Sequence, residues 1–256
     1  MPEVIVLGSG TSSGVPVLGV TYPPSFLANP KNHRTRPSIL IQGPTGNLLV
    51  DCAPDMRTQL LREKIDMVDA VIITHSHADH IMGMDDLRSF CLRSQADMQI
   101  FTLPQYAADI RRIFSYAFED FPPGIEVPRF ALNELGAVPV KLELCGLTVK
   151  VMLVWHGKWP VLALRVNNFA YVTDVKTIPT ESWEMLQGLD TLILDAVRLK
   201  PHPNHLHFEE ALEVAKQLGA KQTYFNHLSH DFDHDVTNHE LPENIQLSFD
   251  GQRILI

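Results

Sequence analysis

The feature that most constrains this chain is the run Thr74-His75-Ser76-His77-Ala78-Asp79-His80, which follows a short β-branched stretch expected to be a strand. Three imidazoles and one carboxylate lie within six residues, and these groups bind zinc and similar divalent metals. At an extended strand end His75 and His77 would point to one side, while a turn at Ala78 would direct Asp79 and His80 toward a second position. One metal cannot easily accept all four side chains, so we expect two neighbouring metal positions.

Three more candidate ligands stand alone at the ends of other predicted strands. They are His156, Asp174 and His227, in that order along the chain. In α/β architectures sites assemble from the loops beyond strand ends, so residues at such ends can converge on one edge. A chance grouping of solvated histidines does not account for this recurrence. We therefore predict a metal centre that combines the run with these three residues.

The pattern of apolar residues predicts two β-rich halves within a single domain spanning residues 1–256. Short apolar or alternating runs indicate strands, and apolar residues at helical spacing indicate helices. The expected strands are 4–7, 38–42, 47–51, 71–74, 98–102, 138–144, 147–154, 161–166, 169–173, 191–195 and 222–226, and the expected helices are 54–64, 105–118 and 208–218. Segment 119–134, which contains Pro122, Pro123 and Pro128, is expected to be an irregular excursion and a candidate lid. The tail is expected to end in a hairpin around Asp250-Gly251.

The composition argues against several classes of protein. Cys52, Cys91 and Cys145 are odd in number and widely separated, so they predict buried thiols rather than disulfides or a Cys-x-x-Cys metal site. No apolar run approaches the ~20 residues of a membrane helix, and the first residues lack a leader pattern, so we expect a cytoplasmic protein without a membrane partner. The net charge of -9 argues against nucleic acid as a partner. A small anionic substrate stays compatible with this charge, because bound metal ions reverse the local field.

The order of the candidate ligands resembles that of the metallo-β-lactamase superfamily, in which His-x-His-x-Asp-His after a strand is followed by a lone His, Asp and His. The resemblance covers nearly the whole chain. It implies the α/β class, as an αββα sandwich of two mixed β-sheets flanked by helices. It also implies that a first metal is bound by His75, His77 and His156 and a second by Asp79, His80 and His227, with Asp174 bridging both.

A narrower resemblance concerns the glycine-rich turn Gly8-Ser9-Gly10-Thr11-Ser12-Ser13-Gly14-Val15-Pro16. Together with Asp51, Asn204-His205, His227-Leu228-Ser229-His230 and Asp250-Gly251, this turn is similar to the group that contains the phosphoribosyl cyclic phosphodiesterase of the carbon-phosphorus lyase pathway. That group is related to ribonuclease Z. Segment 19–24 lacks the cysteines of the group's structural zinc site, so a third zinc is not expected. The glycine-rich turn is either a structural turn or a loop whose N–H groups contact an anion.

The chemistry of such a centre assigns roles to further residues. Two metals can share a water, lower its pKa and polarise the phosphoryl or carbonyl oxygen under attack. A leaving alkoxide then needs an acid, and the resemblance points to His205, with His207 as the competitor because its imidazole can equally carry a proton. Asp51 is expected to accept a hydrogen bond from a metal-bound histidine and fix its tautomer. The predicted catalytic residues are therefore His205, Asp79 and Asp51.

These features predict a dinuclear metal-dependent hydrolase. The leading hypothesis is a phosphodiesterase that uses a metal-bridging hydroxide on a small nucleotide-like or cyclic phosphate ester. A lactone, ester or thioester hydrolase on the same centre is the alternative. An RNA-processing nuclease is disfavoured by the acidic charge, and a non-catalytic metal-binding module is disfavoured because all seven ligands are present. The cofactors would be two divalent ions, zinc or manganese, with iron also compatible; a homodimer is left open.

Overall fold

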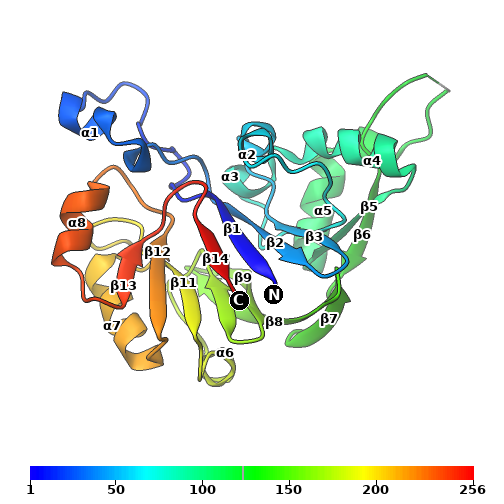
Figure 1. The fold of residues 1–256 in the computed structure, drawn as a ribbon. Helices are drawn as coiled ribbons and strands as arrows, with labels where there is room; N and C mark the ends of the chain where they lie inside the picture. Colours follow the sequence, from blue (N-terminus) through cyan, green and yellow to red (C-terminus); the bar gives the residue numbers. More distant parts are fainter. Residues whose placement is uncertain (123) are drawn as a thin grey trace.

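The computed structural model describes residues 1–122 and 124–256, and two seven-stranded β-sheets pack face to face at its centre (Figure 1). The first sheet has the strand order β14 (Arg253–Leu255), β1 (Glu3–Gly8), β2 (Ser38–Gly43), β3 (Gly46–Val50), β4 (Ala70–Ile72), β5 (Met98–Thr102) and β6 (Phe130–Glu134). Neighbours from β14 to β3 are antiparallel, whereas β3 to β6 run parallel. The last strand pairs with the first, so the two termini lie side by side.

The second sheet repeats this mixed arrangement. Its strand order is β13 (Ile245–Leu247), β12 (Gln222–Asn226), β11 (Thr191–Asp195), β10 (Phe169–Val172), β9 (Trp159–Val166), β8 (Leu147–His156) and β7 (Val140–Leu144). Neighbours from β7 to β10 are antiparallel, and β10 to β13 are parallel. Parallel neighbours place their carboxyl ends at one edge of the sheet, which is where sites form in such sheets.

Helices cover the outer faces of both sheets (Figure 1). The first sheet carries α2 (Met56–Arg62), α4 (Arg88–Ser94) and α5 (Pro104–Ile113), and the second carries α6 (Thr180–Met185) and α7 (Phe208–Leu218). The remaining helices lie in connections: α1 (Pro24–Ala28), α3 (Ala78–Ile81), α8 (His234–Glu240) and the 3-10 turns η1 (Pro30–Asn32), η2 (Met84–Leu87) and η3 (Ser115–Phe118). Among the described residues, no helix has the length and apolar character needed to cross a membrane.

Alternation along β1 shows how the sequence produces these layers. Val4 and Val6 belong to the core between the sheets, which also contains Leu164 of the second sheet. Ile5 and Leu7 point the other way, into the core beneath the helices of the first sheet. Successive side chains of a strand face opposite sides, so a continuous apolar run indicates a strand buried on both faces. This layered burial confirms the predicted αββα sandwich.

Three expectations about individual elements are wrong. Asp250-Gly251 does not turn a hairpin, because β13 and β14 on either side of it belong to different sheets. Segment 119–134, expected to be irregular throughout because of its prolines, ends in strand β6, which pairs with β5. Pro123 lies outside the described residues. The helix predicted over 105–118 ends at Ile113 and continues as a separate 3-10 turn.

Candidate metal centre

All seven candidate ligands lie at strand ends or in the segments that follow them. The run enters from β4 of the first sheet, and α3 begins immediately after His77, which turns the chain so that the following side chains point inward. His156 is the last residue of β8, and Asp174 and His227 follow β10 and β12. The two sheets therefore both contribute to one site, as the spacing of strand ends predicts.

Two groups of side chains each bring four ligand atoms within 4.8 Å of one another. The first group is His75, His77, His156 and Asp174, and the second is Asp79, His80, Asp174 and His227. Asp174 belongs to both: its Oδ2 lies 3.7 Å from His75 Nε2 and 3.4 Å from His80 Nε2. All seven predicted ligands thus converge, and Asp174 occupies the shared position.

Asp51 is fully buried and orders two of the histidines. Its carboxylate accepts hydrogen bonds from the Thr74 N–H and hydroxyl at 2.8 Å each, and its Oδ2 lies 2.7 Å from His80 Nδ1. Because the Thr74 hydroxyl donates its hydrogen to Asp51, its oxygen is left to accept from His75 Nδ1, 3.1 Å away. Both histidines consequently hold a proton on Nδ1 and offer the Nε2 lone pair to the site. The expected hydrogen bond from a candidate ligand, His80, to Asp51 is present.

The nitrogen atoms that face the site fit a bound metal. His156 Nδ1 is 2.8 Å from the Asn204 carbonyl oxygen, so its Nε2 is also left free. Nε2 of His75, His80 and His227 is buried without a hydrogen-bond partner in the described part of the chain. Buried polar atoms are normally paired, and unpaired ones require an explanation such as an ion. Imidazole nitrogens surrounding shared carboxylates match the donors that divalent metals select.

Carboxylates dominate the electrostatics of the site. Burial lowers the pKa of His80, but Asp174, Asp79 and Asp51 outweigh burial and leave this pKa well above its usual value. Burial also opposes protonation of His227, yet Asp174 and the other carboxylates raise its pKa to about 9. Burial raises the pKa of Asp174, whereas His227 and His80 hold it well below the usual range. The site therefore stabilises positive charge, which divalent cations would supply in place of these protons.

His205 lies directly beside the two ligand groups. Its ring centroid is 4.2 Å from that of His156 and 4.8 Å from that of His227. Its Nδ1 is 2.6 Å from Asp195 Oδ2, so Nε2 is the nitrogen left to face a substrate. The competitor His207 is instead the N-cap of α7, with Nδ1 2.7 Å from Glu210. Geometry thus separates the two histidines that the sequence left open.

Asp195 is the residue of this site that the sequence analysis missed. It ends β11, is fully buried, and also accepts a hydrogen bond from the Val175 N–H at 2.9 Å. A signal was available, because Asp51 and Asp174 likewise follow buried strands. Burying a carboxylate destabilises the fold unless the carboxylate is paired, so an Asp at the end of a buried apolar strand indicates a role in a site.

Most N–H groups of the glycine-rich turn are already used within the protein. Ser9 N–H donates to Asp250, Gly10 N–H to Thr35 and Thr11 N–H to Leu228. These three cannot cradle an anion, so the structural interpretation holds for this part of the turn. The hydroxyl-bearing residues Ser12 and Ser13 instead line a cavity with the candidate ligand Asp79.

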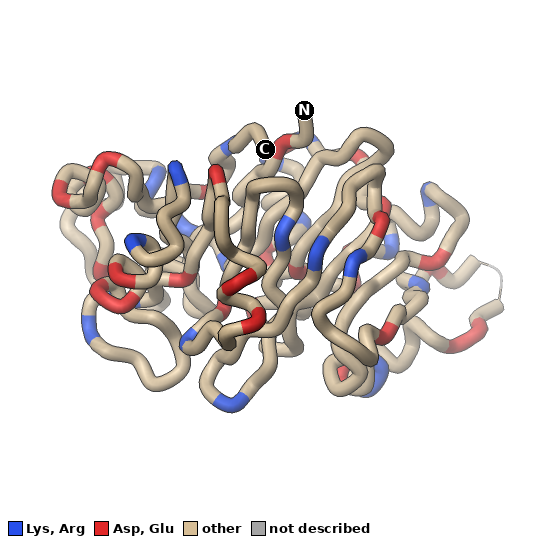
Figure 2. The backbone as a smooth tube through the Cα atoms, turned by 90° about the horizontal axis from the view of Figure 1, so that it is seen from below, with Lys and Arg blue, Asp and Glu red and all other residues tan. Residues whose placement is uncertain are grey.

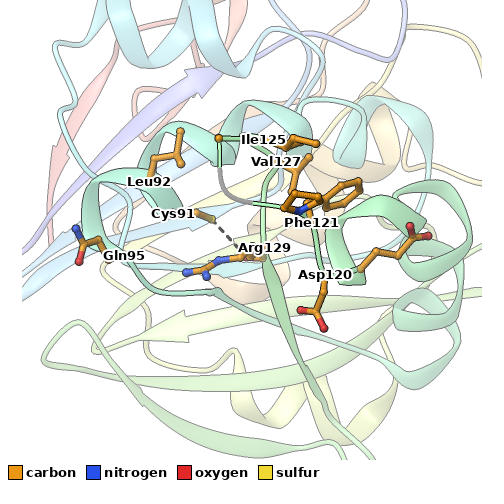
Figure 3. A pocket seen from close by; sticks show the side chains of 11 residues that line it. Cys91, Leu92, Gln95, Asp120, Phe121, Ile125, Val127 and Arg129 are labelled. Atoms are coloured by element: carbon orange, nitrogen blue, oxygen red, sulfur yellow. Dashed lines mark hydrogen bonds between the residues drawn. The ribbon is translucent and has the colours of Figure 1, made fainter.

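A separate pocket of about 470 Å³ lies over α4 (Figure 3). It is lined by α4 residues such as Cys91 and Leu92 and by the excursion that precedes β6, including Phe121 and Arg129. Its described lining contains none of the predicted site residues. The described part of the excursion therefore builds this pocket, and its predicted role as a lid gains no support.

Known structures resemble this one over almost its entire length. A diphosphatase of the PhnP family is 38% identical, with a TM-score of 0.91 over 99% of this chain and 96% of that chain. Zinc-bound PqqB from Methylobacterium extorquens is 17% identical, with a TM-score of 0.77 over 99% of this chain and 100% of that chain. The second likeness shows the fold alone.

Curated relatives match this chain over different shares of its sequence. An octanoyltransferase of Porphyromonas gingivalis is 34% identical over 98% of this chain and 51% of its own length, and a ribonuclease Z of Bradyrhizobium is 29% identical over 46% of this chain and 36% of its own. The chain thus spans about half or less of the curated relatives it matches. Residues 46–228 match the family described as the beta-lactamase superfamily domain. Because that match covers more than half of the sequence, and because the sandwich and the two ligand groups accompany it, the chain belongs to the beta-lactamase superfamily and has the metallo-β-lactamase fold.

Proposed function

We propose that the protein is a two-metal phosphodiesterase that cleaves a phosphorus–oxygen bond in a small nucleotide-like or cyclic phosphate ester. The observation that carries the proposal is the pair of ligand groups that share Asp174, with the His205–Asp195 pair beside them. These residues would hold two divalent cations, which would supply the electrophilic centre, and they place an imidazole beside it that can serve as an acid for the leaving group. Hydrolysis of an ester with a basic leaving alkoxide needs both.

The chain's own residues have distinct roles in this proposal. Divalent cations held by the two ligand groups would activate a water and polarise the phosphoryl oxygen. His205 then donates a proton from Nε2 to the leaving oxygen, while Asp195 holds the ring through Nδ1. Asp51 keeps His80 in the tautomer that a metal requires, a supporting role of the kind that tunes metal sites.

A cavity beside the centre suits a small anion. It has a volume of about 390 Å³ and is lined by Ser12, Ser13, Arg36 and Asp79, among others. Arg36 Nε lies 3.0 Å from Asp55, which fixes the guanidinium and leaves its terminal nitrogens for another acceptor. An arginine held in this way is well suited to bind a phosphate oxygen. The cavity therefore supports a small anionic substrate.

The similarity to a PhnP-family diphosphatase favours phosphorus–oxygen chemistry over attack on a carbonyl. The likeness to ribonuclease Z covers less than half of this chain. Figure 2 shows Lys and Arg interspersed with Asp and Glu along the backbone, and the net charge is -9. Since affinity for long nucleic acids depends on clustered positive charge, the small substrate is preferred.

A substrate panel tests the proposal on protein whose bound metals have been counted. It contains aryl and nucleoside phosphodiesters, a nucleoside diphosphate ester, a lactone, an octanoyl thioester and a precursor tRNA. We expect turnover of the small phosphate esters. Metal-loaded protein that is inert on them, or that hydrolyses the lactone or thioester in preference, would overturn the proposal. Preferential cleavage of precursor tRNA would instead establish an RNA-processing role.

A further inference from the structure

An exposed tryptophan beside the metal centre has no part in the proposed reaction. Trp159 begins β9 and lies directly opposite His156 in the antiparallel pair, so the two side chains share a face. Its ring centroid is 6.2 Å from that of His77, at an interplanar angle of 75°. The residue nevertheless stays 40% exposed. An indole that contacts a candidate metal ligand on one side and solvent on the other is placed to contact a bound substrate.

The turn before Trp159 packs against a segment of the site. Gly157 and Lys158 form a two-residue hairpin turn between β8 and β9, and Gly157 has a φ of +60°. A Cβ at Gly157 would lie 2.5 Å from the Asn204 side-chain oxygen, so the turn and the Asn204 side chain pack closely against each other. Asn204 in turn accepts the hydrogen bond from His156. The turn is therefore held against the segment that carries the candidate acid.

Lys158 adds a positive charge to the same platform. Its Nζ lies 4.9 Å from the centroid of the Trp159 ring, within the range of a cation–π interaction. This contact orients the indole and places an ammonium group at the edge of the site. An aromatic face combined with a cation is the arrangement that binds bases with their attached phosphates in nucleic-acid-binding proteins.

We propose that Trp159 and Lys158 form a platform on which the nucleobase of the substrate stacks. The inference rests on the proposed hydrolysis of small phosphate esters and narrows its substrate class to nucleotides. A cyclic phosphate on a bare sugar has no planar ring and would leave the indole exposed. Stacking on an aromatic side chain tolerates any base, so the platform selects for the presence of a base rather than its identity.

The chain provides a matched control in Trp155. Trp155 is 37% exposed and immediately precedes His156 on β8, so it points to the opposite face of the strand. We would compare Trp159→Ala, Trp159→Phe and Trp155→Ala as metal-loaded proteins. AMP is the probe, and ribose 5-phosphate is its base-free counterpart; the readouts are tryptophan fluorescence quenching and calorimetric Kd. Equal metal content in all variants is required, because Trp159 contacts His77.

We expect Trp159→Ala to weaken AMP binding about tenfold and to abolish most of the quenching, consistent with the usual contribution of base–aromatic stacking. Ribose 5-phosphate should bind equally to the wild type and to this variant. Trp159→Phe should retain most of the affinity, and Trp155→Ala all of it. An equal loss of affinity for AMP and ribose 5-phosphate in Trp159→Ala, or an equal loss for AMP in Trp155→Ala, would overturn the platform.

These measurements separate the two proposals. If no phosphate ester is hydrolysed but the AMP pattern holds, the proposed reaction fails and the platform stands. If nucleotide and base-free esters are hydrolysed with the same KM in wild type and Trp159→Ala, the reaction stands and the platform fails.

Discussion

Replacing Asp195 by asparagine should slow turnover while leaving fold and metal content intact. Asp195 is fully buried, and its Oδ2 lies 2.9 Å from the Val175 nitrogen and 2.6 Å from His205 Nδ1. Asparagine has the same shape, so its carbonyl oxygen can still accept from Val175. The substitution removes the negative charge next to the His205 ring and weakens the hydrogen bond that orients this ring.

The magnitude follows from how much that hydrogen bond is weakened. A hydrogen bond to a charged group contributes about 1.5–3 kcal/mol and a neutral one about 0.5–1.5 kcal/mol, and the difference of about 1–1.5 kcal/mol corresponds to a roughly 5- to 13-fold loss in kcat. An acid matters only where the leaving oxygen is basic, so the full loss should appear with an alkyl leaving group and little of it with 4-nitrophenolate. KM should change little, because Asp195 does not line the cavity that contains Arg36.

A double-mutant cycle shows whether Asp195 acts through its partner. His205→Ala alone should cost at least as much kcat as Asp195→Asn, and Asp195→Asn should cost little more in the His205→Ala background. The same cost in both backgrounds would refute the argument. Loss of metal in Asp195→Asn would refute it too, because Asp195 Oδ1 lies 4.0 Å from the candidate ligand His227 and could then act through that residue.

Two further predictions follow from other parts of the molecule. Metal binding at pH 7 should release protons, because the carboxylates raise the pKa of His227 to about 9 and that of His80 well above its usual value. In the metal-free protein, the contribution of these two groups to the free energy of unfolding is fully present below pH 6.5 and is lost as the pH rises through 9. Calorimetric titration in two buffers of different ionisation enthalpy measures the release, and equal apparent enthalpies would contradict it. Asp250→Ala should lower the free energy of unfolding by about 3 kcal/mol in urea denaturation, because it leaves the N–H groups of the buried Ser9 and the half-buried Thr35 without their acceptor; a change below about 1 kcal/mol would contradict this.

The convergence of the candidate ligands could be predicted from the sequence because each of them is marked by two independent signals. His156, Asp174 and His227 are metal-binding residue types, and each follows an apolar run short enough to be a strand. Parallel strands bring such ends together whatever the loops between them do. Asp195 has the same signals, but its pairing with His205 could not be predicted, because His205 lies ten residues away beyond an irregular loop.

The platform at Trp159 could not be predicted in this way. Which face of β9 its indole occupies depends on the register of β8 with β9, and a shift of one residue would move it to the opposite side. That register is set by a two-residue turn in which Gly157 has a left-handed φ and packs against Asn204, far along the chain. The connection between β13 and β14 also depends on information that local sequence does not contain. Turn residues such as Asp250-Gly251 indicate that the chain reverses, but they do not indicate which sheet receives the next strand.

The first glycines of the glycine-rich turn, Gly8 and Gly10, show how part of a motif can serve packing rather than substrate contact. A Cβ at Gly8 would lie 1.9 Å from the Arg36 carbonyl oxygen, and one at Gly10 would lie 2.8 Å from that of Arg34, so both glycines exist to let two backbone segments meet. The turn also exchanges hydrogen bonds with Leu228: Thr11 N–H donates to its carbonyl, and its N–H donates to Ser9. Leu228 follows His227, which has a left-handed φ of 59°, a conformation uncommon for residues other than glycine. The turn that follows β1 of the first sheet is thereby hydrogen-bonded to the residue after the candidate ligand His227 of the second sheet, and Gly8 and Gly10 are required by this packing rather than by a phosphate.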